Sequence, residues 1–592
     1  METAAGAVRE RWILADSHAG AAELAHAARV PEAVAQLLLA REVTDPAQVH
    51  AFINPALEHL HEPLKMLGMA AAVDRLERAI AEREPVLLYG DYDVDGTVAV
   101  TLLKTAIEML GGVVSFHVPH RLREGYGMQA SVLEEAHAAG VRLVVTVDTG
   151  MRSFAEAETA RSLGLDLIIT DHHPPAASDA LPWALAILNP NQPGCCYPEK
   201  SLCGAAIAMK LAQALLERRD FERTRQKILP SFLKMAGIAT IADAVPLVGE
   251  NRTIAALGLR ELRRPAAAGL RALFREAELD PAARELTGFD VAFRLAPRIN
   301  AAGRMDVASD VIDLFTTRDA ALATELAAKL ERLNRERRDA ESAALLLIDE
   351  RLRTDRELAA GRLLVIDGEG WHRGIIGILA SRVVERTAKP AIVVSVEDGV
   401  AYGSGRSVDG FVLLEAIESC ADLFTRFGGH AFAVGFALPY EKISELKHRL
   451  SAFAEERLAE HVPERVLHLH AELPLDRVTP VLAGWLRKLE PHGHGNPEPV
   501  FLARHVRLLA APRILKERHL RLDLRQEPEP GRAALQSTGA MRAVGWDFAA
   551  RAAGLGLAQG TLIDLAYRVR INEHPEYGGI EAEIAGIRNA ER

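Results

Sequence analysis

Short apolar runs alternate with segments of helical periodicity between residues 85 and 170, and this alternation limits the possible folds more than any other feature. The apolar runs are rich in β-branched residues and cover 86–88, 113–118, 143–147 and 167–169. The segments with helical spacing are 97–110, 129–139 and 153–163. Strand alternating with helix predicts a doubly wound parallel sheet, in which ligands bind beyond the carboxyl ends of the strands.

Acidic and imidazole side chains stand at those predicted strand ends. They are Asp91, Asp93 and Asp95 after the first run, Asp148 after the third, and Asp171, His172 and His173 after the fourth. Because the carboxyl ends of parallel strands share one edge of the sheet, we expect these side chains to meet. Carboxylates with one or two imidazoles are suitable ligands for a divalent-metal hydrolytic site.

Three simpler interpretations compete with a metal site. Asp91-x-Asp93-x-Asp95-Gly96 opens like an EF-hand calcium loop, but Leu102 stands where that loop requires a bidentate Glu, and the preceding segment is a predicted strand. Asp148 alone would be read as a helix cap or turn residue. His172 and His173 precede two prolines, so a plain loop is the alternative there. The ordered combination favours a shared site over all three.

The same residues resemble a known family. Asp-x-Asp-x-Asp-Gly, a lone strand-end Asp and Asp-His-His are similar to the ordered motifs of the DHH phosphoesterase superfamily. Residues 239–246, with Asp243, look like the superfamily's fourth motif, and 428–435 are similar to the glycine-rich motif of its DHH-associated domain. Four further segments resemble its RecJ branch: 119–121, 124–127, 298–304 and 493–499. The resemblance covers the chain from about residue 10 onward.

The resemblance and the sequence pattern together predict an α/β chain of several parts. We expect a helical N-terminal lead-in at 1–80, a DHH catalytic domain with the doubly wound parallel sheet at 81–318, and a connecting helix at 319–356. A second α/β unit, the DHH-associated domain, is expected at 357–462. The resemblance implies an OB-fold β-barrel that binds nucleic acid at 463–592.

Charge and cysteine content limit the chemistry and the compartment. The formal net charge is −11, yet 502–525 carries seven Lys and Arg against two acids, which favours a surface for a phosphate backbone over a merely solvated basic face.

The four cysteines, Cys195, Cys196, Cys203 and Cys420, have no zinc-ligand spacing and indicate no disulfide framework. We find no apolar run of transmembrane length and no secretory leader, and expect a cytoplasmic protein without a membrane partner.

Roles at the metal site are carried over from the resemblance. The implied catalytic residues are Asp93, Asp95, Asp148, Asp171, His172, His173 and Asp243. Asp148 would bridge two Mn²⁺ ions, with Mg²⁺ as the alternative. Asp95, His172 and Asp243 would complete one site, and Asp93 would hold the other. Asp171 would orient His172, His173 would be a metal ligand or a phosphate donor, and Asp91 would be structural. Tyr89 stands where many relatives have a histidine, so we expect weaker binding on the Asp93 side.

Substrate contacts are implied in the same way. Arg121, Ser404 and Arg406 would grip a 5′-terminal phosphate, Arg304 the strand backbone, and Tyr126 would stack on a base or line the channel. His430 lies in one of three glycine-rich turns of the second α/β unit, which favour an anion site. His492 and His494 are interpreted as packing or turn residues.

The resemblance implies an exonuclease that is specific for single-stranded DNA and degrades it 5′→3′ to 5′-mononucleotides in DNA repair and recombination. Implied partners are a single-stranded-DNA-binding protein and a RecQ-type helicase, and we expect a monomer. Two alternatives remain: a DHH phosphodiesterase acting on short oligonucleotides or cyclic dinucleotides, and a non-catalytic DHH-type DNA-binding scaffold of a replicative helicase.

Overall fold

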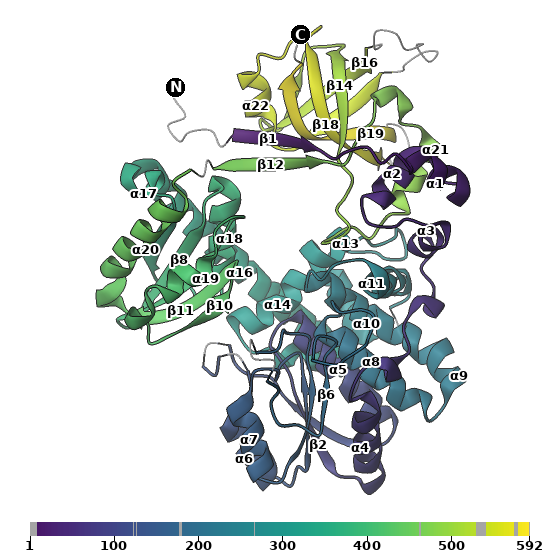
Figure 1. Ribbon diagram of the computed structural model, residues 1–592, viewed down its shortest axis with the longest axis vertical. Helices are drawn as coiled ribbons and strands as arrows, with labels where there is room; N and C mark the ends of the chain where they lie inside the picture. Colours follow the sequence, from purple (N-terminus) through teal and green to yellow (C-terminus); the bar gives the residue numbers. More distant parts are fainter. Residues whose placement is uncertain are drawn as a thin grey trace.

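The chain forms three lobes, of which one long helix joins the first and second (Figure 1). The computed structural model describes residues 9–121, 123–125, 127–176, 180–265, 267–460, 463–527, 540–572 and 578–590. The first lobe lies at the bottom of Figure 1, the second lobe at its left and the C-terminal barrel at its top. Among the described residues, no helix combines the length and the apolar character that crossing a membrane requires.

The first lobe is built on a five-stranded, all-parallel sheet, as the strand–helix alternation predicts. Its spatial order is β3-β2-β4-β5-β6. The bounds are β2 Pro85–Tyr89, β3 Val113–His117, β4 Leu143–Val147, β5 Asp166–Thr170 and β6 Ala186–Leu188. The order reverses between β2 and β4, so the carboxyl ends of these two strands form the crevice in which doubly wound folds bind their ligands.

Helices cover both faces of this sheet. Leu88 and Val145 point to the face covered by α4 Met69–Glu82, α5 Val94–Met109 and α8 Gly204–Glu217. Leu87 and Val144, their chain neighbours, point to the opposite face, under α6 Ala130–Ala138 and α7 Phe154–Ser162. Alternate residues of each strand are therefore buried on opposite faces, which explains why the strands read as continuous apolar runs.

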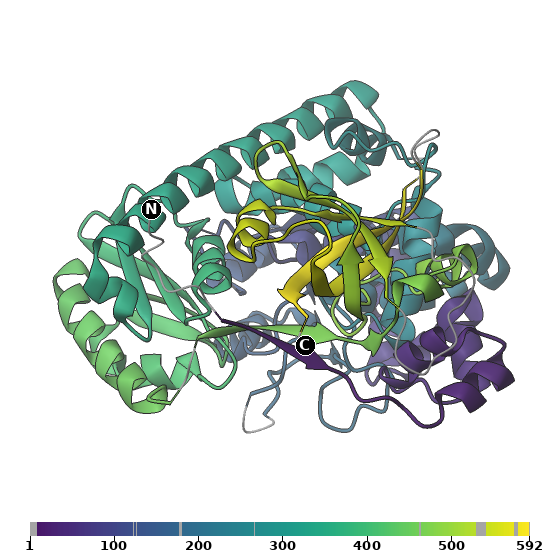
Figure 2. The same ribbon diagram turned by 90° about the horizontal axis from the view of Figure 1, so that it is seen from above.

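A helical layer completes the first lobe. Its members are α10 Leu229–Ala242, α11 Gly249–Leu262, α12 Ala268–Glu276, α13 Gly288–Asp290, the π-helical turn η4 Val291–Leu295, α14 Ala296–Met305 and α15 Ser309–Thr316. The helix α16, Ala320–Thr354, then leaves the lobe. Its 35 residues span about 52 Å, and Figure 2 shows it running along one side of the molecule to the second lobe. There Ala344, Leu345 and Ile348 pack against the second sheet.

The second lobe contains a mixed five-stranded sheet of order β10-β11-β9-β8-β7. The strands are β7 Leu364–Glu369, β8 Ala391–Glu397, β9 Val400–Arg406, β10 Arg426–His430 and β11 Ala433–Pro439. The helices are α17 Arg356–Ala360, α18 Ile376–Thr387, α19 Leu413–Glu418 and α20 Ile443–Arg457. Only β7 and β8 pair in parallel; the other strands are antiparallel.

The C-terminal barrel is closed, as the resemblance implies. The strands β14, β18, β19, β17 and β16 follow one another, and an additional β14–β16 pairing joins the ends of the row. The bounds are β13 Ala471–Glu472, β14 Phe501–Leu508, β15 Arg513–Leu515, β16 His519–Gln526, β17 Met541–Gly545, β18 Leu562–Asn572 and β19 Gly579–Asn589, with helices α21 Pro480–Arg487 and α22 Ala549–Gly554. Closure removes exposed strand edges and encloses an apolar core.

The N-terminal segment differs from the expected helical lead-in. Its first described element is a strand, β1 Arg9–Leu14, which pairs in parallel with β12 Glu464–Leu469. The helices α1 Ala21–Ala28, α2 Glu32–Leu39 and α3 Pro46–Ile53 do form, but Leu24, Leu37 and Phe52 share their core with the C-terminal barrel. Sequence periodicity cannot reveal β1, because a strand of only six residues, three of them polar, is specified by its distant partner.

Candidate metal centre

Loops at one edge of the first sheet bring the predicted ligands together. Asp91 and Asp93 follow β2, Asp148 follows β4, and His172 follows β5. Asp243 joins them from the helical layer, as the residue that ends α10. The predicted convergence at the strand ends is therefore present in the structure.

The first ligand cluster consists of Asp95, His172 and Asp243, whose ligand atoms lie within 4.8 Å of one another. His172 Nε2 is 3.9 Å from Asp95 Oδ2 and 3.9 Å from Asp243 Oδ2. It is also 3.2 Å from Asp148 Oδ1. Asp148 also forms a further group of possible ligands with His172 and His173, so His172 belongs to two of these groups.

The second ligand cluster consists of Asp91, Asp93 and Asp148. Asp148 therefore belongs to the surroundings of both clusters, the arrangement that a residue bridging two ions requires. Asp91 is placed differently from our expectation of a structural role. It lies among the ligand atoms, and its Oδ1 is buried without a hydrogen-bond partner among the described residues.

Backbone groups fix the orientation of these carboxylates. Asp95 accepts hydrogen bonds from the amides of Gly204 (2.6 Å) and Ala205 (2.8 Å) at the start of α8. Asp93 caps α5 by accepting from the amides of Asp95 and Gly96. Gly204 is required at its position, because a Cβ there would lie 2.6 Å from Cβ of Asp148. The start of α8 is thereby held close to the carboxylates of Asp95 and Asp148.

Asp171 acts on a different histidine from the one expected. Its Oδ1 accepts from the backbone amides of His172 and His173 and is 2.7 Å from the ring Nδ1 of His173. We expected Asp171 to orient the His172 ring, but the ring it holds is that of His173. Burial raises the pKa of Asp171, but hydrogen bonding and the charge of His173 outweigh it and hold that pKa below its usual value. Burial lowers the pKa of His173, and Asp171 outweighs that effect and raises it.

Tyr89 lies outside both ligand clusters. It is fully buried, and its phenol donates a hydrogen bond to the carbonyl of Gly127 (3.1 Å). Burial raises its pKa, so the phenol stays neutral. Asp91 supplies a carboxylate to the cluster on this side instead.

The electrostatics of the clusters fit sites for divalent cations. Burial, followed by the neighbouring carboxylates, raises the pKa of Asp148 well above its usual value and that of Asp243 to about 9. The pKa values of Asp91 and Asp93 are raised for the same reasons. Several buried carboxylates cannot all ionise next to one another without a counter-charge. The oxygen-rich donor set with one imidazole fits Mn²⁺ or Mg²⁺.

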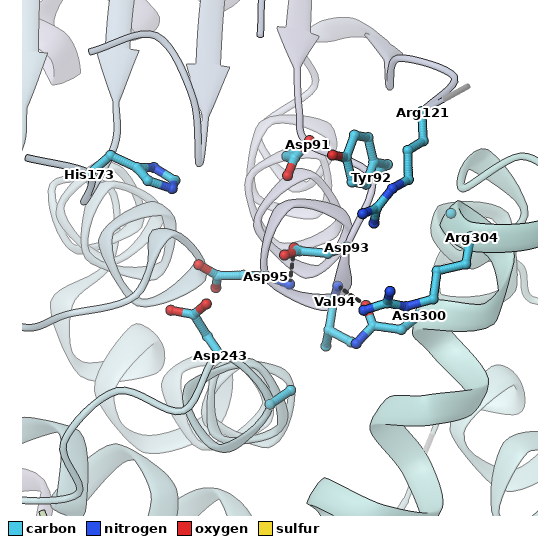
Figure 3. A pocket seen from close by; sticks show the side chains of 12 residues that line it. Asp91, Tyr92, Asp93, Val94, Asp95, Arg121, His173, Asp243, Asn300 and Arg304 are labelled. Atoms are coloured by element: carbon cyan, nitrogen blue, oxygen red, sulfur yellow. Dashed lines mark hydrogen bonds between the residues drawn. The ribbon is translucent and has the colours of Figure 1, made fainter. Parts of the chain in front are cut away.

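A cavity of about 350 Å³ opens onto the clusters. Figure 3 shows Arg121 and Arg304 across this cavity from Asp95, Asp243 and His173. The Arg121 guanidinium lies over the ring of Tyr92, 5.1 Å from its centroid. Arg304 donates to the carbonyl of Gly374 in the second lobe (3.2 Å). The cavity therefore combines a metal-binding side with a cationic side.

Arg406 approaches from β9 of the second lobe. Its Nη1 donates to the carbonyl of Gly405 (2.8 Å) and to Oγ of Ser404 (3.3 Å), and both side chains lie close to Gly377 at the start of α18. Burial, followed by the charge of Arg121, lowers the pKa of Arg406. Among the described residues, Arg406 has no acidic partner within ion-pair distance. The charge of Arg121 on the first lobe thus reaches Arg406 on the second.

The comparisons with known proteins agree with this geometry. Residues 85–240 match the DHH family, N-terminal domain, residues 360–456 match the DHHA1 domain, and residues 469–585 match the RecJ OB domain. The single-stranded-DNA-specific exonuclease RecJ of Escherichia coli (strain K12) is 35% identical over 520 residues, which cover 81% of this chain and 88% of that protein. The chain belongs to the RecJ family.

Two further relatives define the extent of the match. RecJ of Bacillus subtilis (strain 168) is 36% identical over 500 residues, which cover 83% of this chain and 61% of that longer protein. The crystal structure of RecJ in complex with Mn²⁺ from Thermus thermophilus superimposes with a TM-score of 0.80 at 29% identity, covering 99% of this chain and 80% of that one. The family membership and the fold are therefore shown over nearly the whole chain.

Not every predicted contact of the RecJ family reaches the cavity. His430 is exposed at the end of β10 and is not among the residues that line the cavity. Tyr126 lies outside the described residues. Sequence reasoning missed Asn300, whose Oδ1 accepts from the amide of Val94 (3.1 Å) and fixes the start of α5. The signal was present, because Asn300 stands in the motif at 298–304.

Proposed function

We propose that this chain is a metal-dependent exonuclease that is specific for single-stranded DNA and releases 5′-mononucleotides from the 5′ end, in DNA repair and recombination. One observation carries the proposal: the two ligand clusters adjoin each other where Asp148 lies 3.2 Å from His172, and the cavity beside them is also lined by Arg121 and Arg304. A phosphodiester held by the arginines would place its phosphorus beside the carboxylates. The names of the relatives, single-stranded-DNA-specific exonuclease RecJ, support the substrate.

The residues of this chain have separable tasks in the proposed reaction. Asp95, His172, Asp243 and Asp148 would hold one metal ion, and Asp91, Asp93 and Asp148 the other. When bound, two such ions activate the attacking water and stabilise the charge that develops on the phosphate. His173, held by Asp171 and directed into the cavity, would donate a hydrogen bond to a phosphate oxygen.

The cationic side would select the strand end. Arg406, Ser404 and Arg121 would bind the terminal 5′-phosphate, and Arg304 the following backbone. Of these residues, Arg121 and Arg304 line the cavity, whereas Ser404 and Arg406 lie on the second lobe outside its lining. An anchor for the end beside the metal clusters would limit each cut to the first phosphodiester, which accounts for mononucleotide products. We propose a cytoplasmic monomer that works with a single-stranded-DNA-binding protein and a RecQ-type helicase, as the resemblance implies. Co-purification with each candidate partner tests that part.

The direct test incubates the purified chain and Mn²⁺ with single strands labelled at either end. A 5′-labelled strand should release labelled mononucleotide at once, whereas a 3′-labelled strand should shorten gradually. Asp148→Ala should reduce the rate by about a thousandfold or more, equivalent to about 4 kcal/mol in the barrier, while single strands remain bound. Asp339→Ala, an exposed carboxylate on α16, is the matched control. Normal turnover by Asp148→Ala would refute the assignment.

A further inference from the structure

A second hollow, of about 880 Å³, lies between the first lobe and the C-terminal barrel. Phe289 of α13 and Phe293 of η4 line it from the first lobe, and Trp546, which follows β17, lines it from the barrel. These side chains are 64%, 63% and 58% exposed. Large apolar rings that are this exposed and gathered in one hollow indicate a binding surface. We call this hollow the aromatic groove.

Two of the rings already form a stacked platform. The centroids of Phe289 and Phe293 are 4.7 Å apart, and their planes are inclined by 32°. Their high exposure leaves ring surface open to solvent. Such a platform accepts a flat aromatic ligand, because each ring offers a π-face to stack on.

The arginines beside the aromatic groove are already paired with carboxylates. Arg284 lies 2.6 Å from Asp290, and Arg570 bonds with Glu583 at 2.9 Å. Arg570 also binds Glu498. A phosphate group would therefore compete with carboxylates for these arginines. The groove favours the uncharged, planar part of a ligand over its anionic part.

The aromatic groove is continuous with the metal centre through one loop. Ala244 and Val245, which directly follow Asp243, line the groove, while Ala242 and Asp243 line the cavity. His494 Nδ1 lies 3.1 Å from the carbonyl of Ala244, and the amide of Leu247 donates to the carbonyl of His494 (2.7 Å). A strand that leaves the cavity past Asp243 would next meet Phe289 and Phe293.

We propose that the aromatic groove binds the bases of the substrate strand beyond the cleaved nucleotide, stacking them on Phe289, Phe293 and Trp546 with the phosphates directed to solvent. This inference rests on the proposed function and extends it to the choice of single strands. In a duplex each base is covered on both faces by its neighbours and paired at its edge. Only an unpaired, unstacked base can offer a free face to these rings.

Binding measurements test the proposal, in Ca²⁺ and under conditions in which no strand is cleaved. Phe293→Ala and Trp546→Ala should each weaken binding of a strand of about 20 nucleotides by about tenfold. Phe221→Ala is the matched control, because this phenylalanine is 50% exposed on the same lobe but lies outside the groove. Unchanged melting temperatures would show that the variants remain folded.

Strands that lack bases at interior positions separate stacking from other effects. Such strands keep their phosphates, so the wild-type chain should bind them about tenfold more weakly, and Phe293→Ala should cause no further loss on them. Equal binding of intact strands by variant and wild type would overturn the proposal and leave the groove to another ligand, such as a protein. A variant defect that persists on abasic strands would overturn it as well. Absence of exonuclease activity in the wild-type chain would instead refute the proposed function.

Discussion

The carboxylates around Asp148 form the part of the molecule where single residues matter most. Asp91, Asp93, Asp148 and Asp243 all have raised pKa values, because burial and mutual repulsion disfavour their ionised forms. A bound divalent cation reverses this balance by favouring the ionised forms. Protons and metal ions therefore compete for the same oxygens.

This competition predicts how the stability of the metal-free chain depends on pH. An acid with a raised folded-state pKa contributes stability that is present below its unfolded pKa and is lost as pH rises through the folded pKa. Asp243, with a pKa of about 9, should therefore lower the melting temperature of the metal-free chain between about pH 4 and pH 9. Mn²⁺ should remove that decline, and calorimetry across this range measures both effects. Asp243→Asn should flatten the metal-free profile; a profile identical to that of the wild type would contradict the assignment.

Arg406 gives a second prediction at the residue scale. Because Arg121 influences its charge and no acid among the described residues lies within ion-pair distance, removing Arg406 should mainly affect a bound anion. Arg406→Ala should slow degradation of 5′-phosphorylated strands by about 10- to 100-fold, equivalent to about 1.5–3 kcal/mol, and should affect 5′-hydroxyl strands much less. Arg406→Lys should rescue poorly, because an ammonium group cannot replace the planar fork. Initial rates on the two kinds of end measure the ratio. Arg449→Ala, on the same lobe, is the control, and equal losses on both ends would exclude a role in end recognition.

At the scale of elements, local patterns predicted the first sheet well. The run 143–147 is β4, and the segments 129–139 and 153–163 contain α6 and α7. Strands buried on both faces read as uninterrupted apolar runs, so their pattern is visible in sequence. The role of Asp91 was not visible, because proximity to Asp148 depends on how two loops meet in space.

The basic run of the barrel shows another limit of sequence reasoning. Arg504 pairs with Glu472, Arg507 with Glu527, and Arg518 with Asp547. All three acids lie outside residues 502–525. A charge count within 502–525 therefore overstates the positive charge that is free to bind a phosphate. Arg513 and Lys516 have no ion-pair partner among the residues that the structure describes.

This ion pairing predicts which basic side chains of the barrel contribute to binding of the strand backbone. Arg513→Ala and Lys516→Ala should each reduce the slope of log affinity against log salt concentration by about 0.7, because one phosphate contact is lost per variant. Arg507→Ala should change the slope much less, since Glu527 already neutralises this side chain. Titrations of a long single strand at several salt concentrations give the slopes. Equal effects of all three variants would show that pairing within the barrel does not matter.

At the scale of the whole molecule, the barrel is held to the first lobe by a buried guanidinium. Arg252 of α11 is 2% exposed and donates to the carbonyls of Phe52, Lys488, Leu489 and Glu490 at 2.8–3.2 Å. These carbonyls belong to the N-terminal helices and to the segment that follows α21. No sequence motif predicts this role of Arg252, because the acceptors are backbone atoms from distant parts of the chain.

We expect Arg252→Met to detach the barrel without disturbing the metal centre. The variant keeps an apolar stem but leaves four carbonyls without their donor, two of them in buried hydrogen bonds, which should cost about 3 kcal/mol or more of docking free energy. Limited proteolysis should then cleave between the second lobe and the barrel faster than in the wild type, while Mn²⁺ affinity measured by electron paramagnetic resonance stays the same. Arg263→Ala, an exposed arginine after the same helix, controls for loss of charge. Unchanged protease resistance would show that other contacts suffice.

The parallel pairing of β1 with β12 has a consequence for biosynthesis. The ribosome makes Arg9 long before Glu464, the residue with which Arg9 pairs. Throughout that interval β1 has no strand partner, and α1–α3 lack the barrel residues that complete their core. The nascent chain must therefore carry an unsatisfied strand edge and an apolar helical surface while both α/β lobes emerge, and these early segments reach their final places only when translation is nearly finished.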